Sequence, residues 1–276
     1  MNGPKIAAKF GGSSVAGPEE VAKVRQIVYD WKIQCVVVSA PGQLRKNGQK
    51  VTDMLYRIHR GRLSEAEIRS IFVDIEKRYR KIISGLRLSP NLLDLDLKEL
   101  RRLAFKPDCS VDHFVSRGEY LNAIVMAEVL GYKCIDAVDF VSFKDGELDM
   151  EETRWRWNAL DLKDAKCVIP GFYGANPDGT IKTFTRGGSD LTGAIVAALI
   201  GADVYQNWTD VPGLLGAPPR IVPHAKQVRE VTFKEIRELA YSGAEVFHPL
   251  AMAPLREAGI PVNLRSTNCP DGRLVF

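Results

Sequence analysis

The chain has 276 residues, of which 45% are hydrophobic, and its formal net charge of +4 comes from charges interspersed along the sequence. The lack of a basic block argues against a nucleic-acid-binding protein. Because no apolar run could span a bilayer and the first residues lack the apolar segment of a signal peptide, we expect a cytoplasmic protein that does not bind membranes.

Strand and helix patterns alternate from the start of the chain. Residues 5–10 form a short apolar strand pattern that ends in a Gly-Gly-Ser-Ser turn, and a helix pattern begins at Pro18. Its apolar side chains share one face: Val21, Val24, Val28 and Trp31. Residues 35–39 are a β-branched run typical of a buried strand, so strand, helix and strand predict a parallel pair with a right-handed crossover. Residues 41–50 are polar and predict a loop.

The alternation continues to the end of the chain. Helix patterns fill most of residues 51–130, with breaks near Gly61, Gly85 and Pro107. Further helices are predicted over residues 189–200 and 233–242. Further strands are predicted over residues 134–138, 167–172, 180–184, 203–208 and 260–264. Together these elements predict an α/β fold, a three-layer αβα sandwich around a mainly parallel sheet, with ligands at the carboxyl ends of strands.

The most informative motif is Thr-Phe-Thr-Arg-Gly-Gly-Ser-Asp at residues 183–190, directly before an apolar helix pattern. Exposed N–H groups and the helix dipole favour anions at such a helix start. Arg186 can hold a carboxylate or phosphate in a two-pronged contact, and Asp190 can hold a metal ion or orient a lysine. The motif therefore predicts a phosphoryl-transfer site or a site for an anionic substrate.

Three other segments have both a functional and an ordinary structural interpretation. In residues 9–14, Lys9 and the two glycines suit a phosphate, although a plain strand-to-helix turn fits too and the spacing is not that of a Walker A loop. Glu119, in Ser-Arg-Gly-Glu, suits an ammonium group, but a solvated Arg–Glu pair is the favoured interpretation of that segment alone. Thr209 and Asp210 begin a turn that could bind the ribose or base of a nucleotide, and a plain turn without a ligand fits equally well.

Together and in this order, these segments resemble the aspartate kinases of the amino-acid kinase family. The matching segments are KFGGSS at 9–14, VSA at 38–40, SRGE at 116–119, TFTRGGSD at 183–190, WTDVPG at 208–213, FHPLAM at 247–252 and IPVNLRSTNCP at 260–270. The resemblance covers nearly the whole chain. The combination of KFGGSS, RGGSD and WTDVPG is far more specific than any one of these segments.

The resemblance implies phosphorylation of the L-aspartate β-carboxylate by ATP with Mg²⁺, giving 4-phospho-L-aspartate and ADP, the first step of lysine, threonine and methionine biosynthesis. Lys9 would neutralise the γ-phosphate, and Asp190 would orient Lys9 and help to place magnesium. Glu119 would hold the substrate ammonium and Arg186 its α-carboxylate. The implied substrate-binding residues are Ser39, Thr52, Glu119, Arg186 and Ser189. The implied nucleotide-binding residues are Lys9, Gly11, Gly12, Ser13, Thr209, Asp210 and Arg220.

The resemblance also implies two lobes, an aspartate-binding lobe over residues 1–200 and a nucleotide-binding lobe over residues 201–276, and a possible homodimer. The chain departs from the family pattern in three places. Glu245 stands where many members have a lysine that holds nucleotide phosphates, and Pro218 stands where many have an aspartate before Pro-Arg. The third departure is the length, which leaves no room for the paired ACT domains that usually follow.

Two alternatives stay open beside an active aspartate kinase. The first is another carboxylate, carbamate or phosphate kinase of the same fold, although the SRGE and RGGSD segments favour aspartate. The second is a regulatory subunit with an impaired nucleotide site, and the acidic Glu245 is the reason to consider it.

Overall fold

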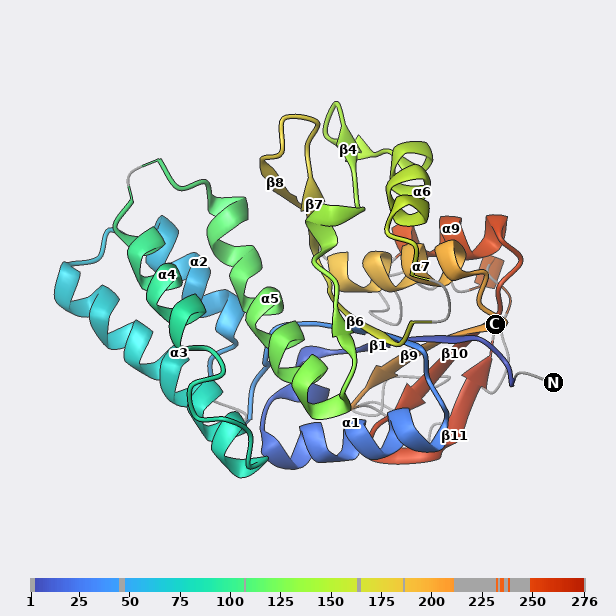
Figure 1. The fold of residues 1–276 in the computed structure, drawn as a ribbon, viewed down its shortest axis with the longest axis horizontal. Helices are drawn as coiled ribbons and strands as arrows, with labels where there is room; N and C mark the ends of the chain where they lie inside the picture. The colour runs from blue at the N-terminus through green and yellow to red at the C-terminus, as the bar shows by residue number, and fades with distance from the viewer. Residues whose placement is uncertain are drawn as a thin grey trace.

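Among the residues that the structure describes, seven strands form one central sheet, in the order β11-β10-β9-β1-β2-β6-β3 (Figure 1). The computed structural model describes residues 3–44, 48–106, 108–162, 165–185, 187–210, 232, 234–235, 238 and 249–275. Every neighbouring pair in the sheet is parallel except β10–β11, which is antiparallel. The predicted parallel pairing of the first two strands and the mainly parallel sheet are confirmed.

The strand bounds are Ile6–Phe10 for β1, Cys35–Val38 for β2, Lys133–Cys134 for β3, Cys167–Pro170 for β6, Val204–Thr209 for β9, Val262–Ser266 for β10 and Cys269–Val275 for β11. Every residue of β2 and β6 is buried. This continuous burial is what a parallel strand covered on both faces requires, and it explains why these strands are apolar throughout.

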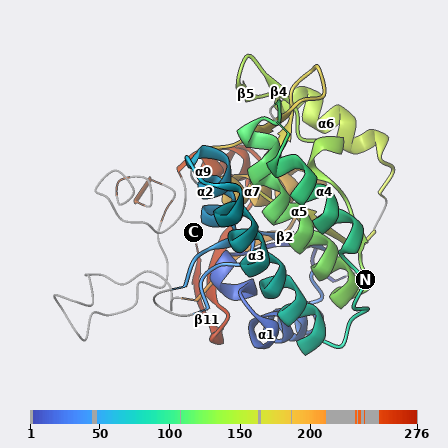
Figure 2. The same ribbon diagram turned by 90° about the vertical axis from the view of Figure 1, so that its left-hand side faces the viewer.

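Helices cover both faces of the sheet, as Figures 1 and 2 show from two sides. One face carries α1 (Pro18–Asp30), α2 (Val51–Arg60), α3 (Glu65–Gly85), α4 (Asp94–Ala104) and α5 (Val111–Leu130). The other carries α6 (Met150–Ala159), α7 (Gly188–Ile200) and α9 (Pro249–Glu257). Successive β1 side chains alternate between two apolar cores, with Ala8 in the first and Ala7 in the second. The predicted αβα sandwich is therefore confirmed.

Local sequence signals explain where several helices begin and end. Pro18 occupies the first turn of α1, where its missing N–H costs no hydrogen bond. A capping box between Ser64 and Glu67 begins α3. Gly201 ends α7 in the left-handed conformation, with φ of 59°.

Some predicted elements differ from the structure. Strand β3 has two residues, because the side chain of Asp136 accepts a hydrogen bond from Val138 N and starts a 3₁₀ turn, Ala137–Asp139. The predicted strand over residues 180–184 is confirmed as β8 (Ile181–Thr183), which pairs with β7 (Tyr173–Ala175) in a hairpin separate from the main sheet. A second hairpin joins β4 (Phe143–Lys144) to β5 (Glu147–Leu148).

Among the described α-helices and strands, six were not predicted: β4, β5, β7, α6, α9 and β11. The predicted helix over residues 233–242 lies largely outside the described residues. The division into lobes at residue 200 stays a prediction. The sheet itself is continuous across that point, because β9 pairs with β1 in register from Ile6 opposite Val204 to Phe10 opposite Trp208.

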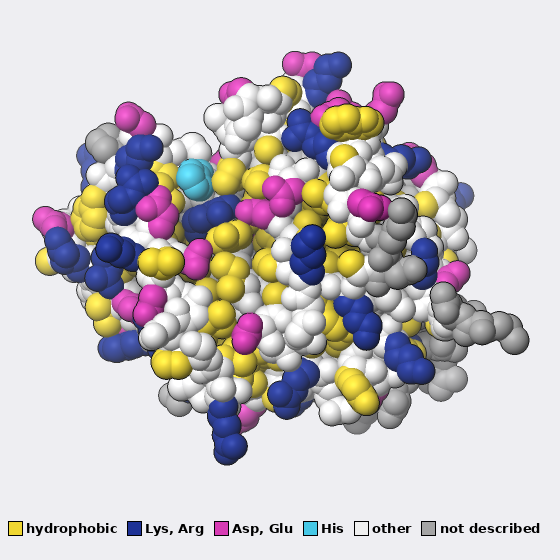
Figure 3. All heavy atoms as spheres, viewed as in Figure 1, with side chains coloured by type: hydrophobic (Ala, Val, Ile, Leu, Met, Phe, Trp, Pro, Cys, Tyr) yellow, Lys and Arg dark blue, Asp and Glu magenta, His cyan; other side chains and the backbone are white. Residues whose placement is uncertain are grey.

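The surface carries both signs of charge, interspersed over the face that Figure 3 shows. Within the described part of the chain, no helix is long and apolar enough to cross a membrane.

Two tryptophans of α6 differ in burial: Trp157 is buried against Phe140, whereas Trp155 is exposed.

Candidate active site

A cavity of about 200 Å³ lies beyond the carboxyl ends of β1 and β2, next to the start of α7. Its lining residues come from segments far apart in the sequence: Lys9, Ser39, Thr52, Glu119, Phe172, Gly187, Gly188, Ser189 and Asp190. Six residues predicted for catalysis or substrate binding therefore share one cavity. Its place agrees with the prediction that ligands bind where parallel strands end.

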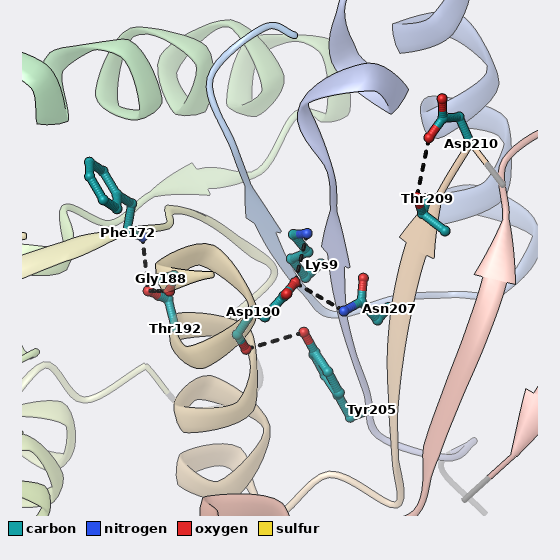
Figure 4. Close-up of polar contacts among 9 residues, drawn as sticks. All are labelled: Lys9, Phe172, Gly188, Asp190, Thr192, Tyr205, Asn207, Thr209 and Asp210. Atoms are coloured by element: carbon teal, nitrogen blue, oxygen red, sulfur yellow. Dashed lines mark hydrogen bonds and ion pairs between the residues drawn. The ribbon is translucent and has the colours of Figure 1, made fainter. Parts of the chain in front are cut away.

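Lys9 and Asp190 form an ion pair in this cavity (Figure 4). Lys9 Nζ lies 2.7 Å from Asp190 Oδ1, and the two side chains are 12% and 17% exposed. Asp190 stands in the first turn of α7, which Gly187 begins with φ of 76°, a conformation that favours glycine. Asn207 Nδ2 donates a hydrogen bond to the same carboxylate oxygen over 3.0 Å. The carboxylate thus fixes the lysine ammonium near the helix start.

Glu119 brings a buried carboxyl group to the same cavity. It is 4% exposed, and its Oε1 accepts hydrogen bonds from Ala40 N at 3.1 Å and Thr52 Oγ1 at 3.4 Å. Its Oε2 is buried and has no hydrogen-bond partner among the residues that the structure describes. Burial raises the pKa of Glu119 from its ordinary 4.5 to about 7. A cationic group entering the cavity would satisfy the unpaired oxygen and favour the ionised carboxylate.

The burial of Glu119 contradicts the interpretation of Ser-Arg-Gly-Glu as a solvated ion pair. Helix α5 approaches the segment after β2 closely at Gly118, where an added Cβ would lie 3.0 Å from Ala40 Cβ. The Gly118 carbonyl accepts a hydrogen bond from Tyr79 Oη at 2.7 Å. Close packing at Gly118 therefore buries the next residue, Glu119.

The turns that follow β1 and β9 meet beside this cavity. Gly11 N donates to Trp208 O at 3.0 Å, and Ser13 Oγ donates to Asp210 Oδ1 at 2.9 Å. Thr209 Oγ1 donates to the same Asp210 oxygen at 3.3 Å. Five of the residues predicted for the nucleotide thus lie together: Gly11, Gly12, Ser13, Thr209 and Asp210.

Two predicted arginines, Arg186 and Arg220, lie outside the described residues, as does Glu245. Among the residues that the structure describes, no group of three or more His, Cys, Asp or Glu side chains is arranged to hold a metal ion. The cavity does offer the carboxylate of Asp190 and the hydroxyl of Ser189. Oxygen donors of this kind suit Mg²⁺ when phosphates and water supply most of its ligands.

Three residues at the site were not predicted: Asn122, Phe172 and Asn207. Asn122 Nδ2 donates to Ser39 O at 2.7 Å and so holds the wall of the cavity. Phe172 lines the cavity with φ of 84°, which is strained for a bulky residue, and its N–H donates to Thr192 Oγ1 at 3.1 Å (Figure 4). Asn207 is the parallel neighbour of Lys9, a pairing that only the strand order reveals.

Comparison with known proteins agrees with this geometry. The sequence profile described as "Amino acid kinase family" matches residues 4–266. Aspartokinase 3 of Bacillus subtilis is 35% identical over 277 residues, which cover 95% of this chain and 61% of that protein. The chain thus spans less than two thirds of the length of this relative.

Solved structures give the same result. Aspartate kinase from Clostridium acetobutylicum superposes with a TM-score of 0.89 at 37% identity, covering 98% of this chain and 62% of that one. E. coli aspartokinase III, solved in complex with aspartate and ADP, superposes with a TM-score of 0.87 at 28% identity and covers 98% and 64%. Because the family profile matches residues 4–266, nearly the whole chain, the chain belongs to the amino acid kinase family.

Proposed function

We propose that this chain is the catalytic part of an aspartate kinase, which transfers the γ-phosphoryl group of ATP to the β-carboxylate of L-aspartate. The observation that carries the proposal is the unpaired, buried oxygen of Glu119 in the same small cavity as the Lys9–Asp190 ion pair. One wall suits the ammonium group of an amino acid and the other suits a phosphate. Relatives named as aspartokinases over the same region support this assignment.

On the nucleotide side, Lys9 neutralises charge on the γ-phosphate and Asp190 keeps its ammonium in place. The backbone N–H groups of the Gly11-Gly12-Ser13 turn donate to phosphate oxygens, as glycine-bearing turns after a strand commonly do. Thr209, Asp210 and Arg220 bind the nucleotide. These roles account for the contact between the turns that follow β1 and β9.

On the acceptor side, Glu119 accepts hydrogen bonds from the α-ammonium group and Arg186 holds the α-carboxylate in a bidentate contact. Ser189 donates to the reacting carboxylate, and Ser39 and Thr52 line the pocket. The buried Glu119 favours a cation over a neutral group at this point, because a bound ammonium pairs its otherwise unsatisfied oxygen.

The reaction then needs positioning more than covalent help from the protein. A β-carboxylate oxygen attacks the γ-phosphorus, a new P–O bond forms, and the bond to the β–γ bridging oxygen breaks with its electrons remaining on ADP. The products are the acyl phosphate 4-phospho-L-aspartate and ADP. The carboxylate is already ionised near neutral pH, so no general base is required.

Asp190 would help the nucleotide phosphates to hold Mg²⁺, which would further neutralise the phosphate charge. We further propose that the reaction is the first step of lysine, threonine and methionine biosynthesis and that it takes place in the cytoplasm. These last assignments follow from the resemblance to aspartate kinases.

Trapping of the acyl phosphate tests the proposal. With ATP, magnesium, aspartate and hydroxylamine, the wild-type chain is expected to form aspartyl hydroxamate. Lys9→Met is expected to lower kcat by at least about 100-fold, because charge neutralisation in the transition state is lost. Exposed Lys23→Met on α1 is the matched control and keeps its activity.

A substrate panel separates the proposal from its alternatives. Faster turnover of glutamate, N-acetylglutamate or UMP than of aspartate would show a different kinase of the same fold. Absence of any hydroxamate, together with weak binding of an ATP analogue by calorimetry, would favour a regulatory subunit with an impaired nucleotide site. In that case Glu245→Lys should tighten nucleotide binding.

A further inference from the structure

Arg78, on the face of α3 toward the segment that follows β2, directs its guanidinium at backbone carbonyl groups. Its Nη1 donates to Gly42 O at 2.5 Å and its Nη2 donates to Gln49 O at 3.4 Å. The side chain is half-buried, and burial lowers the pKa of the guanidinium from its ordinary value. A cation that loses part of its hydration must be compensated, and here two carbonyl oxygens do so.

The two carbonyls belong to opposite ends of the segment between β2 and α2. Val51 N donates to Pro41 O at 3.1 Å, so the chain leaving β2 and the chain entering α2 lie side by side. Gly42 follows Pro41 and Gln49 precedes this contact by two residues. The guanidinium of Arg78 therefore links the backbone just after β2, at Gly42, to the backbone just before α2, at Gln49.

Gly42 in turn touches the glycine turn that follows β1. Its N–H donates to Gly12 O at 2.8 Å. An added Cβ on Gly42 would lie 2.6 Å from the carbonyl carbon of Gly12, and one on Gly12 would lie 2.8 Å from Ala40 O. The two backbones are in direct contact, so Gly42 cannot shift without affecting Gly12.

We propose that Arg78 is a positioning residue for the phosphate-binding turn, because it holds Gly42 against Gly12 without itself lining the cavity. The proposal rests on the proposed function, in which Gly11, Gly12 and Ser13 bind nucleotide phosphates. Arg78 acts through Gly42 and does not touch the substrate. Its loss would leave the N–H groups of the turn less well ordered for the phosphates, whereas Glu119 and the acceptor pocket would keep their contacts.

A guanidinium is the group that this arrangement requires. Its planar fork reaches two carbonyls at once, whereas a lysine ammonium on a flexible stem reaches one. Arg78→Lys is therefore expected to keep part of the effect and Arg78→Ala to lose it.

The guanidinium of Arg78 borders a groove of about 560 Å³ between α2 and α3. Other charged side chains line it: Arg57, Glu67, Asp74, Lys77 and Lys81. Because the groove reaches Arg78 from solvent, a free guanidinium ion can enter the space that Arg78→Ala vacates. This makes chemical rescue possible.

Calorimetry with a non-hydrolysable ATP analogue and magnesium tests the role without needing turnover. Arg78→Ala is expected to weaken analogue binding by about tenfold, and Arg78→Lys by less. Guanidinium chloride, below the concentrations that denature the protein, should restore most of the affinity of Arg78→Ala, whereas sodium chloride of equal ionic strength should not. In turnover assays the KM for ATP should rise while the KM for aspartate changes less than about twofold.

Arg80→Ala is the matched control, since Arg80 lies on the same helix and binds Pro90 O and Asp94 instead. It should leave analogue binding unchanged. Unchanged binding in Arg78→Ala, an equal loss in Arg80→Ala, or no rescue by guanidinium would overturn the proposal. So would a wild-type chain that does not bind the analogue at all. A wild type that binds the analogue but forms no aspartyl hydroxamate refutes only the proposed acceptor, and the Arg78 comparison still stands.

Discussion

Burial of Glu119 couples its ionisation to the stability of the fold. Between its ordinary pKa of 4.5 and its pKa of about 7 in the fold, the unfolded carboxyl loses its proton while the folded one keeps it. The unfolded state then binds fewer protons, so the stability of the ligand-free protein falls as pH rises through this window and levels off above it. Ionisation of Glu119 in the empty cavity thus costs folding free energy near neutral pH.

Glu119→Gln removes this cost, because a glutamine side chain does not ionise. We expect the variant to exceed the ligand-free wild type in unfolding free energy by on the order of 3 kcal/mol near pH 8, with the difference shrinking toward about pH 5. Urea unfolding at several pH values measures it. Exposed Glu128→Gln on α5 is the control and should show no such trend. A difference independent of pH would contradict the assigned burial effect.

The residues of the site could be predicted from the sequence mainly where a motif carries them. Lys9, Glu119 and Asp190 stand in motifs and meet in one cavity. The burial of Glu119 could not be predicted, because its sequence neighbours Arg117 and Gly118 are polar or small and the cover comes from α2 and the segment after β2. The sequence gives no indication that Asn207 belongs to the site, because its contact with Asp190 depends on β9 lying beside β1.

At the scale of elements, α7 packs closely against β9 at Gly193. A Cβ added at Gly193 would lie 2.9 Å from two ring carbons of Tyr205, a side chain that is fully buried. Alanine normally favours a helix over glycine by about 1 kcal/mol, but overpacking a core costs roughly 1–3 kcal/mol. We therefore expect Gly193→Ala to lower stability by up to about 2 kcal/mol, measured by thermal or urea unfolding.

A double-mutant cycle with Tyr205→Phe checks the cause. Removing the tyrosine hydroxyl relieves the closest part of the clash, so Gly193→Ala should cost less when it is combined with Tyr205→Phe than when it is made alone. Equal cost in both backgrounds would show that the tyrosine hydroxyl is not what the alanine meets.

Elements could be predicted where their own residues show the pattern of a helix or strand. The pairing of a strand with its neighbours could not be predicted in this way. Strands β2 and β6 are apolar along their whole length because both faces are covered, and α1 shows its buried face every three to four residues. Strand β8 has a strand pattern as well, but pairing with β7 takes it out of the main sheet. Nothing within residues 180–184 distinguishes the two pairings.

At the scale of the whole molecule, one continuous sheet separates two apolar cores. Trp208 lies in the core beside α1 and Trp157 in the core beside α7. Because β1 contributes side chains to both cores, unfolding of one exposes the strand that supports the other. We expect a single cooperative transition, in which far-UV circular dichroism and tryptophan fluorescence report the same urea midpoint.

Variants with tryptophan replacements make this test specific. Trp157→Phe leaves Trp208 as the buried reporter of the first core. Trp208→Phe combined with Trp31→Phe leaves Trp157 for the second, because Trp31 also packs against the first core. After correction for each variant's own stability by circular dichroism, fluorescence should follow the same curve in both. Two separated transitions would instead support lobes that divide near residue 200 and unfold independently.

The position of β1 has a consequence for the synthesis of the chain. β2 is made soon after β1 and can cover one of its edges, but the other edge waits for β9, whose Asn207 pairs with Lys9. Until then the ribosome-bound chain presents an unpaired apolar strand edge, which invites association with other nascent chains. The strand that carries the central lysine is thus enclosed only after β9 (Val204–Thr209) has been made.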